Sequence, residues 1–323
     1  MKVSIALASY NGGAYILDQL KSFTTQSKLP DEVIVSDDCS TDNTVELIKK
    51  FAINAPFEIK IYVNESNIGY SRNFNNALSK TTGDLIFLSD QDDVWFNTKI
   101  EKIYMLAAAD KSLLIMNDAE ITDSNLKRTG VTKLKQIISL GNNTDKFVMG
   151  CCAAIKRELL DLALPIDINF PAHDTWISWL ADYMKLKKIT PEVLQYYRRH
   201  DSNESKYLAN STNQNSKMNQ LIDKINQSNK NNGSELNDAE IAHNIFNENL
   251  KKLKKIHKPH RLYKKLEEAC DISSQNLYKV RYRLKIRNLS LSTRVLKATL
   301  FYFKGGYKDF SGIFSLIRDI KSN

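Results

Sequence analysis

The sequence lacks the long apolar segments that would place it in a membrane. None of its 323 residues belongs to an uninterrupted apolar run of about 18 to 20 residues, the length that a spanning helix requires. The first residues, MKVSIALASYNGG, become polar too early for a secretory signal peptide. Both absences favour a cytoplasmic protein. With 42% apolar and 26% charged residues, the chain can still bury a full core, in one large domain with an appendage or in two small domains.

Cysteine is scarce, and its spacing excludes several of its usual roles. Cys39, Cys151, Cys152 and Cys270 form no CxxC pair and have no histidine at ligand spacing, and two adjacent cysteines do not bridge easily. We therefore expect four reduced, structural thiols. The sequence also contains no internal repeat.

Acidic residues are few in the last part of the chain. Residues 1–200 hold 23 basic and 25 acidic residues, whereas residues 251–323 hold 19 basic and 5 acidic residues. The net charge of +9 therefore comes from the C-terminal part. Such a segment would attract a polyanionic surface, either nucleic acid or anionic lipid headgroups.

Short apolar runs alternate with segments of helical period in the first half of the chain. The runs are rich in β-branched residues, which predicts buried strands, and apolar residues three or four positions apart between them predict helices. The predicted strands are 3–8, 32–35, 59–63 and 84–88, and the predicted helices are 16–23, 45–51, 72–78 and 100–106. This alternation predicts an α/β fold with a doubly wound, mainly parallel sheet.

The alternation ends near Asp201. Residues 202–234 are rich in Asn, Ser, Gln and Lys, which is typical of a polar connection, and apolar residues then return with an approximately helical period. We expect a domain at 1–205, a linker-like segment at 206–235, and a basic, mainly helical extension at 236–323.

Acidic side chains follow two of the predicted strands. In a parallel sheet, ligands bind outside the carboxyl ends of the strands, where Asp37–Asp38 and Asp90–Asp93 are expected. Three carboxylates at 90, 92 and 93 repel one another unless a cation or hydrogen-bond donors neutralise them, and their hard oxygen atoms suit Mg²⁺ or Mn²⁺. A lone DxDD is also typical of a solvated acidic turn. The second acidic pair favours a ligand site, because a nucleoside needs acceptors for its N–H and hydroxyl groups.

Four segments in order resemble the nucleotide-sugar-dependent glycosyltransferases of family 2, which have the GT-A fold. They are SIALASYNGGAYILDQL, VIVSDDCSTDNTVELI, NIGYSRNFNNAL and GDLIFLSDQDDVW. With two later segments, Gly150–Cys152 and His173–Trp176, the resemblance covers approximately residues 1–200. The closing YRRH at Tyr197–His200 resembles the rhamnosyltransferase subset.

The resemblance implies a set of donor-binding residues. They are Ser9, Tyr10, Asn11, Asp38, Asn67, Arg72, Asn73, Asp90, Asp93, Arg198 and His200. Asp38 would accept from the base, with Asp37 structural, and Asp90 would bond the ribose or brace its loop. Arg72 is equally well explained as part of an exposed helix face. Trp95 is expected to pack in the core.

The resemblance also implies the metal ligands and the base. Asp92 would coordinate Mn²⁺ or Mg²⁺ at the diphosphate, while His200 would contact the diphosphate or serve as a second metal ligand. The alternative for the Arg-Arg-His run is an exposed basic loop. Asp174 matches the family's catalytic base, with His173 supporting it, although Asp174 is also placed to cap a helix. The implied reaction is an inverting transfer.

The basic, apolar segments around residues 296–303 and 310–317 leave several partners open. They are typical of a peripheral membrane contact, and equally of a helical bundle that packs on the catalytic domain or forms a homodimer. A nucleic-acid-binding module is disfavoured, because no reader motif is present and the strand-end carboxylates would repel phosphates. A nucleotidyltransferase is disfavoured because residues 8–13 lack a glycine-rich loop bearing Arg or Lys.

The family resemblance also suggests the donor and the product. It favours dTDP-L-rhamnose, with UDP-hexoses next, because recognition of sugar hydroxyls depends on pocket shape. The acceptor is expected to be a glycan or lipid-linked glycan of a bacterial surface polysaccharide. The enzyme would then work in the cytoplasm, at the inner face of the cell membrane.

Overall fold

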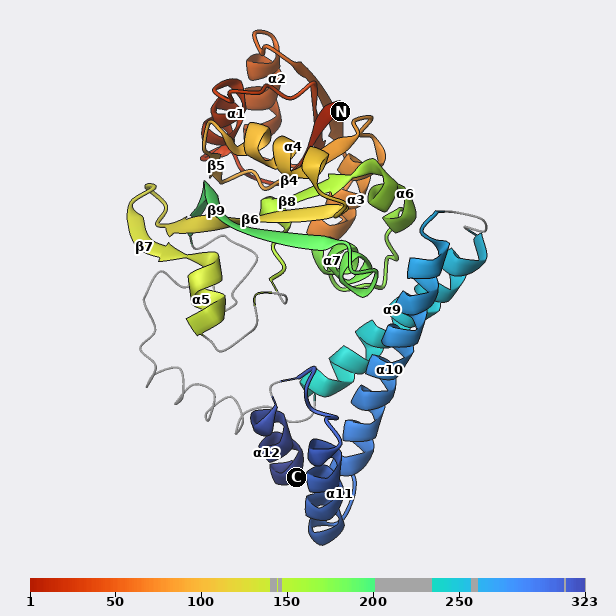
Figure 1. Cartoon of the computed structure of the whole chain (residues 1–323). Helices are drawn as coiled ribbons and strands as arrows, with labels where there is room; N and C mark the ends of the chain where they lie inside the picture. The colour runs from red at the N-terminus through yellow and green to blue at the C-terminus, as the bar shows by residue number, and fades with distance from the viewer. Residues whose placement is uncertain (140–143, 145–146, 201–233, 257–260, 311, 323) are drawn as a thin grey trace. The chain divides into compact units, whose positions relative to one another are not determined.

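The chain forms two compact units, one within residues 1–214 and one within residues 215–323 (Figure 1). The computed structural model describes residues 1–139, 144, 147–200, 234–256, 261–310 and 312–322. The linker expected at 206–235 lies outside the described residues, apart from its last two positions.

A nine-stranded sheet is the centre of the first unit. Its strand order is β3-β2-β1-β4-β8-β6-β9-β5, and β7 pairs with β6. The strands are β1 (Val3–Ser9), β2 (Glu32–Asp37), β3 (Glu58–Val63), β4 (Leu85–Ser89), β5 (Val94–Trp95), β6 (Leu114–Thr122), β7 (Arg128–Thr132), β8 (Ala153–Lys156) and β9 (Lys187–Arg198).

The four strands predicted from the sequence lie side by side and run parallel. Strand β1 pairs with β2 and β4, and β2 pairs with β3. The register places Ser9 beside Asp37, so these strands end at one edge of the sheet. The other half of the sheet is mixed, because β8 runs antiparallel to β4 and β6. The predicted α/β class is confirmed.

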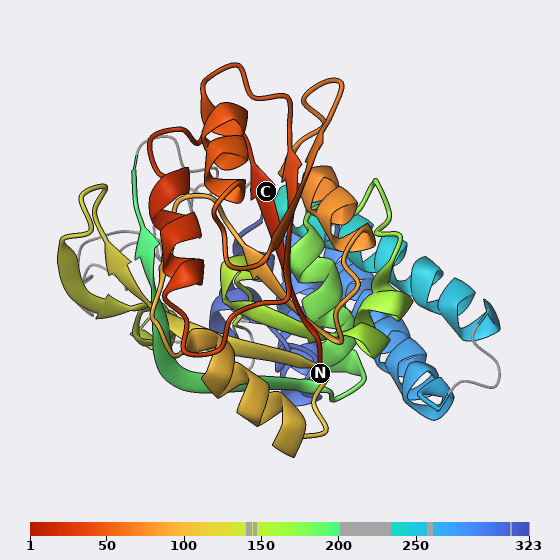
Figure 2. The same ribbon diagram turned by 90° about the horizontal axis from the view of Figure 1, so that it is seen from above.

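Helices cover both faces of this sheet (Figures 1 and 2). Apolar residues at alternate positions of β1, Val3, Ile5 and Leu7, share one core cluster with apolar residues of α1, α2 and α4, while α3, α6 and α7 lie on the opposite face. The helices are α1 (Ile16–Thr24), α2 (Thr44–Ala52), α3 (Tyr70–Ser79), α4 (Lys99–Ala109), α5 (Lys133–Ser139), α6 (Arg157–Ala163) and α7 (His173–Tyr183), with a 3-10 turn at Gly150–Cys152.

The second half of the sheet was not predicted. Strand β6 is buried along its whole length, yet it contains Asn117, Asp118 and Glu120. These polar residues interrupt the apolar run on which strand prediction depends. Tertiary contacts support them instead: Asp118 Oδ1 accepts from the backbone N–H groups of Ala119 and Leu134.

The second unit consists of helices, which confirms the helical extension. They are α9 (Ser234–Ile256), α10 (Tyr263–Arg287), α11 (Leu291–Phe303) and α12 (Ile313–Lys321). Leu250 and Val280 are completely buried in α9 and α10. Across the described parts of both units, every helix is too short or too polar to cross a bilayer.

A buried ion cluster attaches α12 to α10. The Asp319 carboxylate is completely buried and accepts from Arg283 Nε (2.7 Å) and Nη2 (3.0 Å), from Arg287 Nε (2.8 Å) and from the Tyr307 hydroxyl (2.9 Å). Buried charges are tolerated when each is paired and hydrogen-bonded, as here.

Replacement of Asp319 tests this cluster. Asp319→Ala leaves the buried Arg283 guanidinium without its partner, so we expect the second unit to lose about 3 to 5 kcal/mol of unfolding free energy. Urea denaturation followed by circular dichroism measures the loss. Asp309→Ala is the control, because Asp309 pairs with Lys279 at the surface and should change little. Equal stability of the two variants would show that the cluster contributes nothing special.

Candidate active site

The polar segments that follow β1 to β4 meet at one edge of the sheet. Backbone bonds join them: Asp38 N–H donates to Ser9 O (2.8 Å), and Asn64 N–H donates to Asp37 O (2.8 Å). Residues that are far apart in the sequence therefore share the carboxyl ends of the parallel strands, where ligands of such sheets bind.

Asp37 organises the loop after β2. It is completely buried and accepts from Ser9 Oγ (2.6 Å), from Ser40 N–H (2.8 Å) and from Ser40 Oγ (2.7 Å). Ser9 was predicted to line the nucleotide pocket. It is instead buried, and its hydroxyl donates to Asp37.

Asp38 holds the loop between β3 and α3. Its carboxylate accepts from Asn64 Nδ2 (2.9 Å), Ile68 N–H (2.9 Å) and Gly69 N–H (2.8 Å). Gly69 precedes α3 with a φ of 87°, a conformation that glycine adopts without strain. Asp38 is itself only 2% exposed, and since a carboxylate has about four acceptor positions, the predicted nucleobase contact would have to use the one that these bonds leave.

Asn73 links strand ends instead of facing outward. It is buried, and its Nδ2 group donates to Ser9 O (3.2 Å) and Ser36 O (2.9 Å), while its Oδ1 accepts from Asn64 Nδ2 (3.1 Å). Both amide hydrogens are therefore used within the protein. This corrects the donor-facing position predicted for Asn73: its contacts give it a positioning role.

Four predicted donor residues are exposed at this edge. Tyr10, which is 43% exposed, and the exposed Asn11 both follow β1. Asn67, which is also exposed, follows β3. Asn11 Oδ1 accepts from Thr41 N–H (2.8 Å). Arg72 is exposed on α3 and makes no hydrogen bond or ion pair with another described residue. Its guanidinium is accessible to a ligand.

Gln91, which was not among the predicted site residues, joins two of the loops. Its Oε1 accepts from Tyr10 N–H (2.9 Å) and its Nε2 donates to Tyr10 O (2.9 Å). A Cβ at Gly12 would lie 2.1 Å from Gln91 Oε1, so a side chain there would displace the Gln91 amide from Tyr10. The position of Gln91 inside the DQDD motif was the available signal.

The three acidic residues of this motif differ in environment. Asp93 is completely buried and accepts from Gln195 Nε2 (2.8 Å) and from Arg198 N–H (3.3 Å). Burial, with the nearby charge of Asp92, raises the pKa of Asp93 to about 7. Asp93 was predicted to bind the sugar donor, and its complete burial disagrees with a direct contact of this kind. Burial also raises the pKa of Asp90 well above its usual value, and the neighbouring carboxylates raise it further.

A buried lysine lies beneath these carboxylates. Lys99, the first residue of α4, is completely buried; its Nζ donates to Cys151 O (2.9 Å) and to Gln195 Oε1, and lies 3.9 Å from the centre of the Trp95 ring. Burial lowers the pKa of Lys99 to about 8. Gln195 thus connects Lys99 to Asp93. The sequence gave no signal for Lys99, since lysine at a helix start is normally exposed.

Arg198 fixes the backbone of the acidic loop. It is buried, and its guanidinium donates to Asp92 O (2.8 Å), Ser124 O (3.0 Å) and Asp18 Oδ2 (2.8 Å). Because these bonds use three of its five N–H donors, Arg198 positions Asp92, in place of the predicted contact with the donor.

His200 lies against Asp92, the other predicted metal ligand. His200 Nε2 is 2.8 Å from Asp92 Oδ2, and the imidazole stacks on Tyr15 with ring centres 4.5 Å apart. Residues from the ends of β4 and β9 thus converge, although the sequence separates them by 108 positions. Tyr15 was not predicted, although it lies within the first family-like segment, SIALASYNGGAYILDQL.

Asp174 opens α7 close to the acidic loop. Its Oδ1 accepts from Thr175 N–H (2.6 Å), whereas the cap residue of the helix is Ala172. A Cβ at Gly150 would lie 3.4 Å from Asp174 Cβ, so the glycine leaves room for it. The charge of Asp174 contributes to the raised pKa of Asp90, which places both carboxylates within electrostatic range.

His173 supports the start of α7. The imidazole is buried, stacks on Phe74 at 4.1 Å between ring centres and meets the edge of Tyr70 at 6.0 Å. Burial lowers the pKa of His173, so the ring is neutral at pH 7. A neutral ring adds no positive charge beside Asp174.

The donor set at the acidic loop fits a divalent cation. The predicted ligands Asp92 and His200 are in contact, and one ligand atom each of Asp90, Asp93 and Cys151 lie within 4.8 Å of one another. Burial, together with the neighbouring carboxylates, raises the pKa of Asp90 and Asp93, and a bound cation would offset both effects. Oxygen ligands suit Mg²⁺ or Mn²⁺, and the imidazole of His200 is compatible with Mn²⁺.

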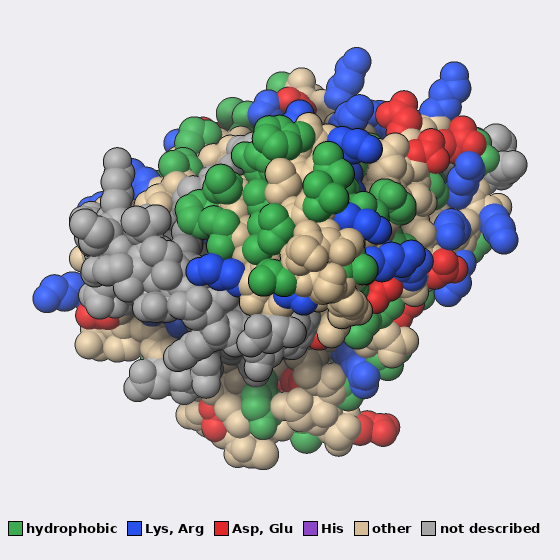
Figure 3. Space-filling model, turned by 90° about the horizontal axis from the view of Figure 1, so that it is seen from below, with side chains coloured by type: hydrophobic (Ala, Val, Ile, Leu, Met, Phe, Trp, Pro, Cys, Tyr) green, Lys and Arg blue, Asp and Glu red, His purple; other side chains and the backbone are tan. Residues whose placement is uncertain are grey.

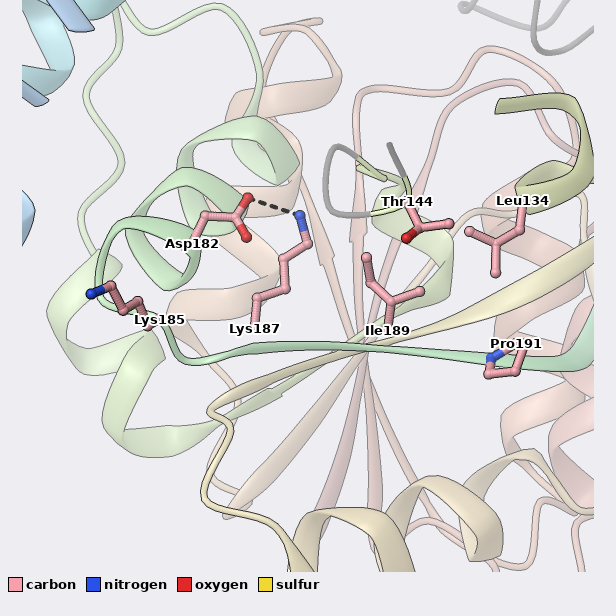
Figure 4. A pocket seen from close by; sticks show the side chains of 7 residues that line it. All are labelled: Leu134, Thr144, Asp182, Lys185, Lys187, Ile189 and Pro191. Atoms are coloured by element: carbon pink, nitrogen blue, oxygen red, sulfur yellow. Dashed lines mark hydrogen bonds and ion pairs between the residues drawn. The ribbon is translucent and has the colours of Figure 1, made fainter. Parts of the chain in front are cut away.

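A cavity of about 650 Å³ lies elsewhere in this unit (Figure 4). Asp182 and Lys187 form an ion pair of 2.8 Å in its wall. None of the predicted site residues lines it. We therefore place the candidate active site at the strand ends and not in this cavity. The lining residues are Leu134, Thr144, Asp182, Lys185, Lys187, Ile189 and Pro191.

Comparison with solved structures supports the fold. The crystal structure of S. aureus TarS 1-349 in complex with UDP-GlcNAc superimposes with a TM-score of 0.54 over 99% of this chain and 90% of that chain. The sequence identity is 17%, so this similarity concerns the fold alone.

Comparison with sequences identifies the family. The model of glycosyl transferase family 2 matches residues 4–162. An uncharacterized glycosyltransferase of Nostoc sp. is 28% identical over 225 residues, 66% of this chain and 70% of that protein. The dTDP-rhamnosyl transferase RfbG of Shigella flexneri is 30% identical over 219 residues, 61% of this chain and 73% of that protein. The carboxylates at the strand ends therefore belong to a nucleotide-sugar-dependent enzyme, and the chain is a member of glycosyl transferase family 2.

Proposed function

We propose that this enzyme transfers a hexosyl residue, with inversion, from a nucleoside diphosphate sugar to a hydroxyl group of a growing bacterial surface glycan. Residues 1–205 would form the catalytic domain. The observation that carries the proposal is the place of Asp174 beside Gly150, because the next residue, Cys151, has a ligand atom within 4.8 Å of those of Asp90 and Asp93, in the loop that would hold the diphosphate.

Asp174 is the proposed general base. Its carboxylate takes the proton of the acceptor hydroxyl while that oxygen bonds to the anomeric carbon, and the bond from this carbon to the diphosphate breaks on the opposite face. Asp174 Oδ1 is held by Thr175 N–H, so the carboxylate has a defined orientation. The displaced nucleoside diphosphate carries the bonding electron pair away.

Asp92 and His200 are the proposed metal ligands, with Mn²⁺ or Mg²⁺ as the cation. When bound, the cation offsets the negative charge that develops on the leaving diphosphate. Arg198 holds the Asp92 backbone and Tyr15 supports the His200 ring, so both ligands are oriented by the protein. Arg72, Tyr10 and Asn67 are proposed to contact the donor, because they are exposed at the same edge.

We propose dTDP-L-rhamnose as the donor. The relative from Shigella flexneri is named a dTDP-rhamnosyl transferase, which supports this choice. A UDP-hexose is the second candidate, because the residues at the strand ends recognise nucleotide and diphosphate and leave the sugar less constrained. The acceptor would be a glycan or lipid-linked glycan at the inner face of the cell membrane. Four free thiols are compatible with the reducing cytoplasm.

Replacement of Asp174 tests the base. Asp174→Asn keeps the shape of the side chain but removes its proton affinity, so we expect kcat to fall about 10²- to 10⁴-fold while nucleotide affinity stays nearly unchanged. Steady-state transfer and calorimetric nucleotide binding measure the two effects. Asp161→Asn, at an exposed position of α6, is the matched control. Wild-type turnover in Asp174→Asn would disprove the assignment.

Replacement of Asp92 tests the metal ligand. Asp92→Ala should weaken nucleotide-sugar binding in the presence of Mn²⁺ or Mg²⁺ and leave the weaker binding in EDTA unchanged, because the side chain acts through the cation. Calorimetry under both conditions checks this. An equal loss with and without metal would mean that Asp92 contacts the donor directly.

A thermal-shift screen tests the donor. In the presence of Mn²⁺, the nucleotide sugar that binds most tightly should raise the melting temperature most, by mass action. We expect dTDP-L-rhamnose to give the largest increase, and UDP-hexoses a smaller one. A larger shift with a UDP-hexose would make that sugar the donor.

A further inference from the structure

Helix α12 has two exposed apolar residues and two buried polar residues, while its other apolar residues, Phe314, Leu316 and Ile320, are half-buried. Ser315 and Asp319, four positions apart, are buried, whereas Ile313 and Ile317 are 51% and 37% exposed. A helix on the surface of a soluble domain normally has the reverse orientation. The exposed apolar side of α12 is therefore not explained by packing within this unit.

The ion cluster at Asp319 fixes this orientation. Arg283, Arg287 and Tyr307 hold the buried carboxylate, so rotation of α12 toward burial of Ile313 and Ile317 would break these bonds. The loss would leave charged groups buried without partners, which is costly. The outward apolar side is thus a stable feature.

Helix α11 adds a second row of exposed apolar side chains. Leu296, Leu300 and Phe303 occur at positions i, i+4 and i+7 and are 61%, 51% and 81% exposed. Together with Ile313 and Ile317 of the neighbouring helix, we name these residues the C-terminal apolar face. Figure 3, which views the molecule from the end where α11 and α12 lie in Figure 1, shows apolar side chains gathered among lysines and arginines.

Unpaired lysines lie beside these apolar residues. Lys297 follows Leu296 and Lys304 follows Phe303, and both lysines are exposed without an ion pair to another described residue. Lys308 and Lys321 have the same character. Long lysine side chains can place their ammonium groups at headgroup level while neighbouring apolar residues enter the acyl boundary.

These features favour one kind of partner. A second copy would bring the same lysines together, since residues 291–321 hold six basic and two acidic residues, and Asp319 is already neutralised inside. A nucleic acid would attract the lysines but gain nothing from five apolar side chains. An anionic lipid bilayer satisfies both the charge and the apolar area.

We infer that the C-terminal apolar face, with Lys297 and Lys304, docks the enzyme on an anionic lipid bilayer. The inference deepens the proposed function, on which its biological meaning rests, because a lipid-linked acceptor lies at such a surface. The residues that form the face and its lysines all belong to the second unit. The vesicle experiment below therefore does not depend on transfer.

Co-sedimentation of the full chain with lipid vesicles tests the docking. The wild type should bind phosphatidylcholine vesicles that contain phosphatidylglycerol, and bind pure phosphatidylcholine more weakly. The double variant Leu300→Ser with Phe303→Ser should lose about tenfold or more in affinity, since each apolar side chain contributes to insertion. Ile241→Ser with Ile256→Ser is the matched control, because these residues are equally exposed on α9.

Three results would overturn the inference. The first is absence of binding to the anionic vesicles, and the second is equal affinity of the double variant and its control. The third is a wild-type dimer in light scattering that the double variant loses, which would make the face a contact between copies. Transfer to a soluble acceptor is measured in parallel: its absence together with normal vesicle binding would reject the proposed function and leave the docking intact.

Discussion

The carboxylates at the strand ends repel one another, and the buried ammonium group of Lys99 lies close enough to Asp90 and Asp93 to offset part of their charge. Gln195 bonds to both Lys99 and Asp93, and Arg198 donates to the backbone oxygen of Asp92. The three acidic residues of the motif therefore have different environments. Asp93 is buried and hydrogen-bonded, the pKa of Asp90 is raised well above its usual value, and Asp92 contacts His200. A motif of three similar side chains thereby acquires distinct chemical roles, because burial and partners differ even where residue type does not.

The sequence predicted the parallel half of the sheet well, because β1, β2 and β4 are buried apolar runs and α1 repeats its apolar residues with a clear helical period. It predicted β6 poorly. There, Asn117, Asp118 and Glu120 are tolerated only through contacts with residues distant in the chain, and such contacts leave no local pattern.

The candidate site shows the same division. The residue types and order at the strand ends predicted that Asp38 and Asp92 would lie at one edge of the sheet, since parallel strands bring their carboxyl ends together, whereas Asp174 was expected there from the family resemblance alone. The direction of each side chain was not predictable: Ser9, Asn73 and Arg198 use their polar groups inside the protein, Lys99 supports the site from a position outside the motifs, and Tyr15 does so from a motif position that was not singled out. The hydrogen-bond partners of a side chain depend on the folded structure, whereas a motif predicts only the part of the fold in which the residue lies.

The contact between Gly12 and Gln91 makes two loops inseparable. The Gln91 amide bonds to both the N–H and the C=O of Tyr10. It occupies the space that a side chain at position 12 would need. A chimera that imports a loop with a larger residue at position 12 would therefore release Gln91 from Tyr10, so the two loops are best exchanged together.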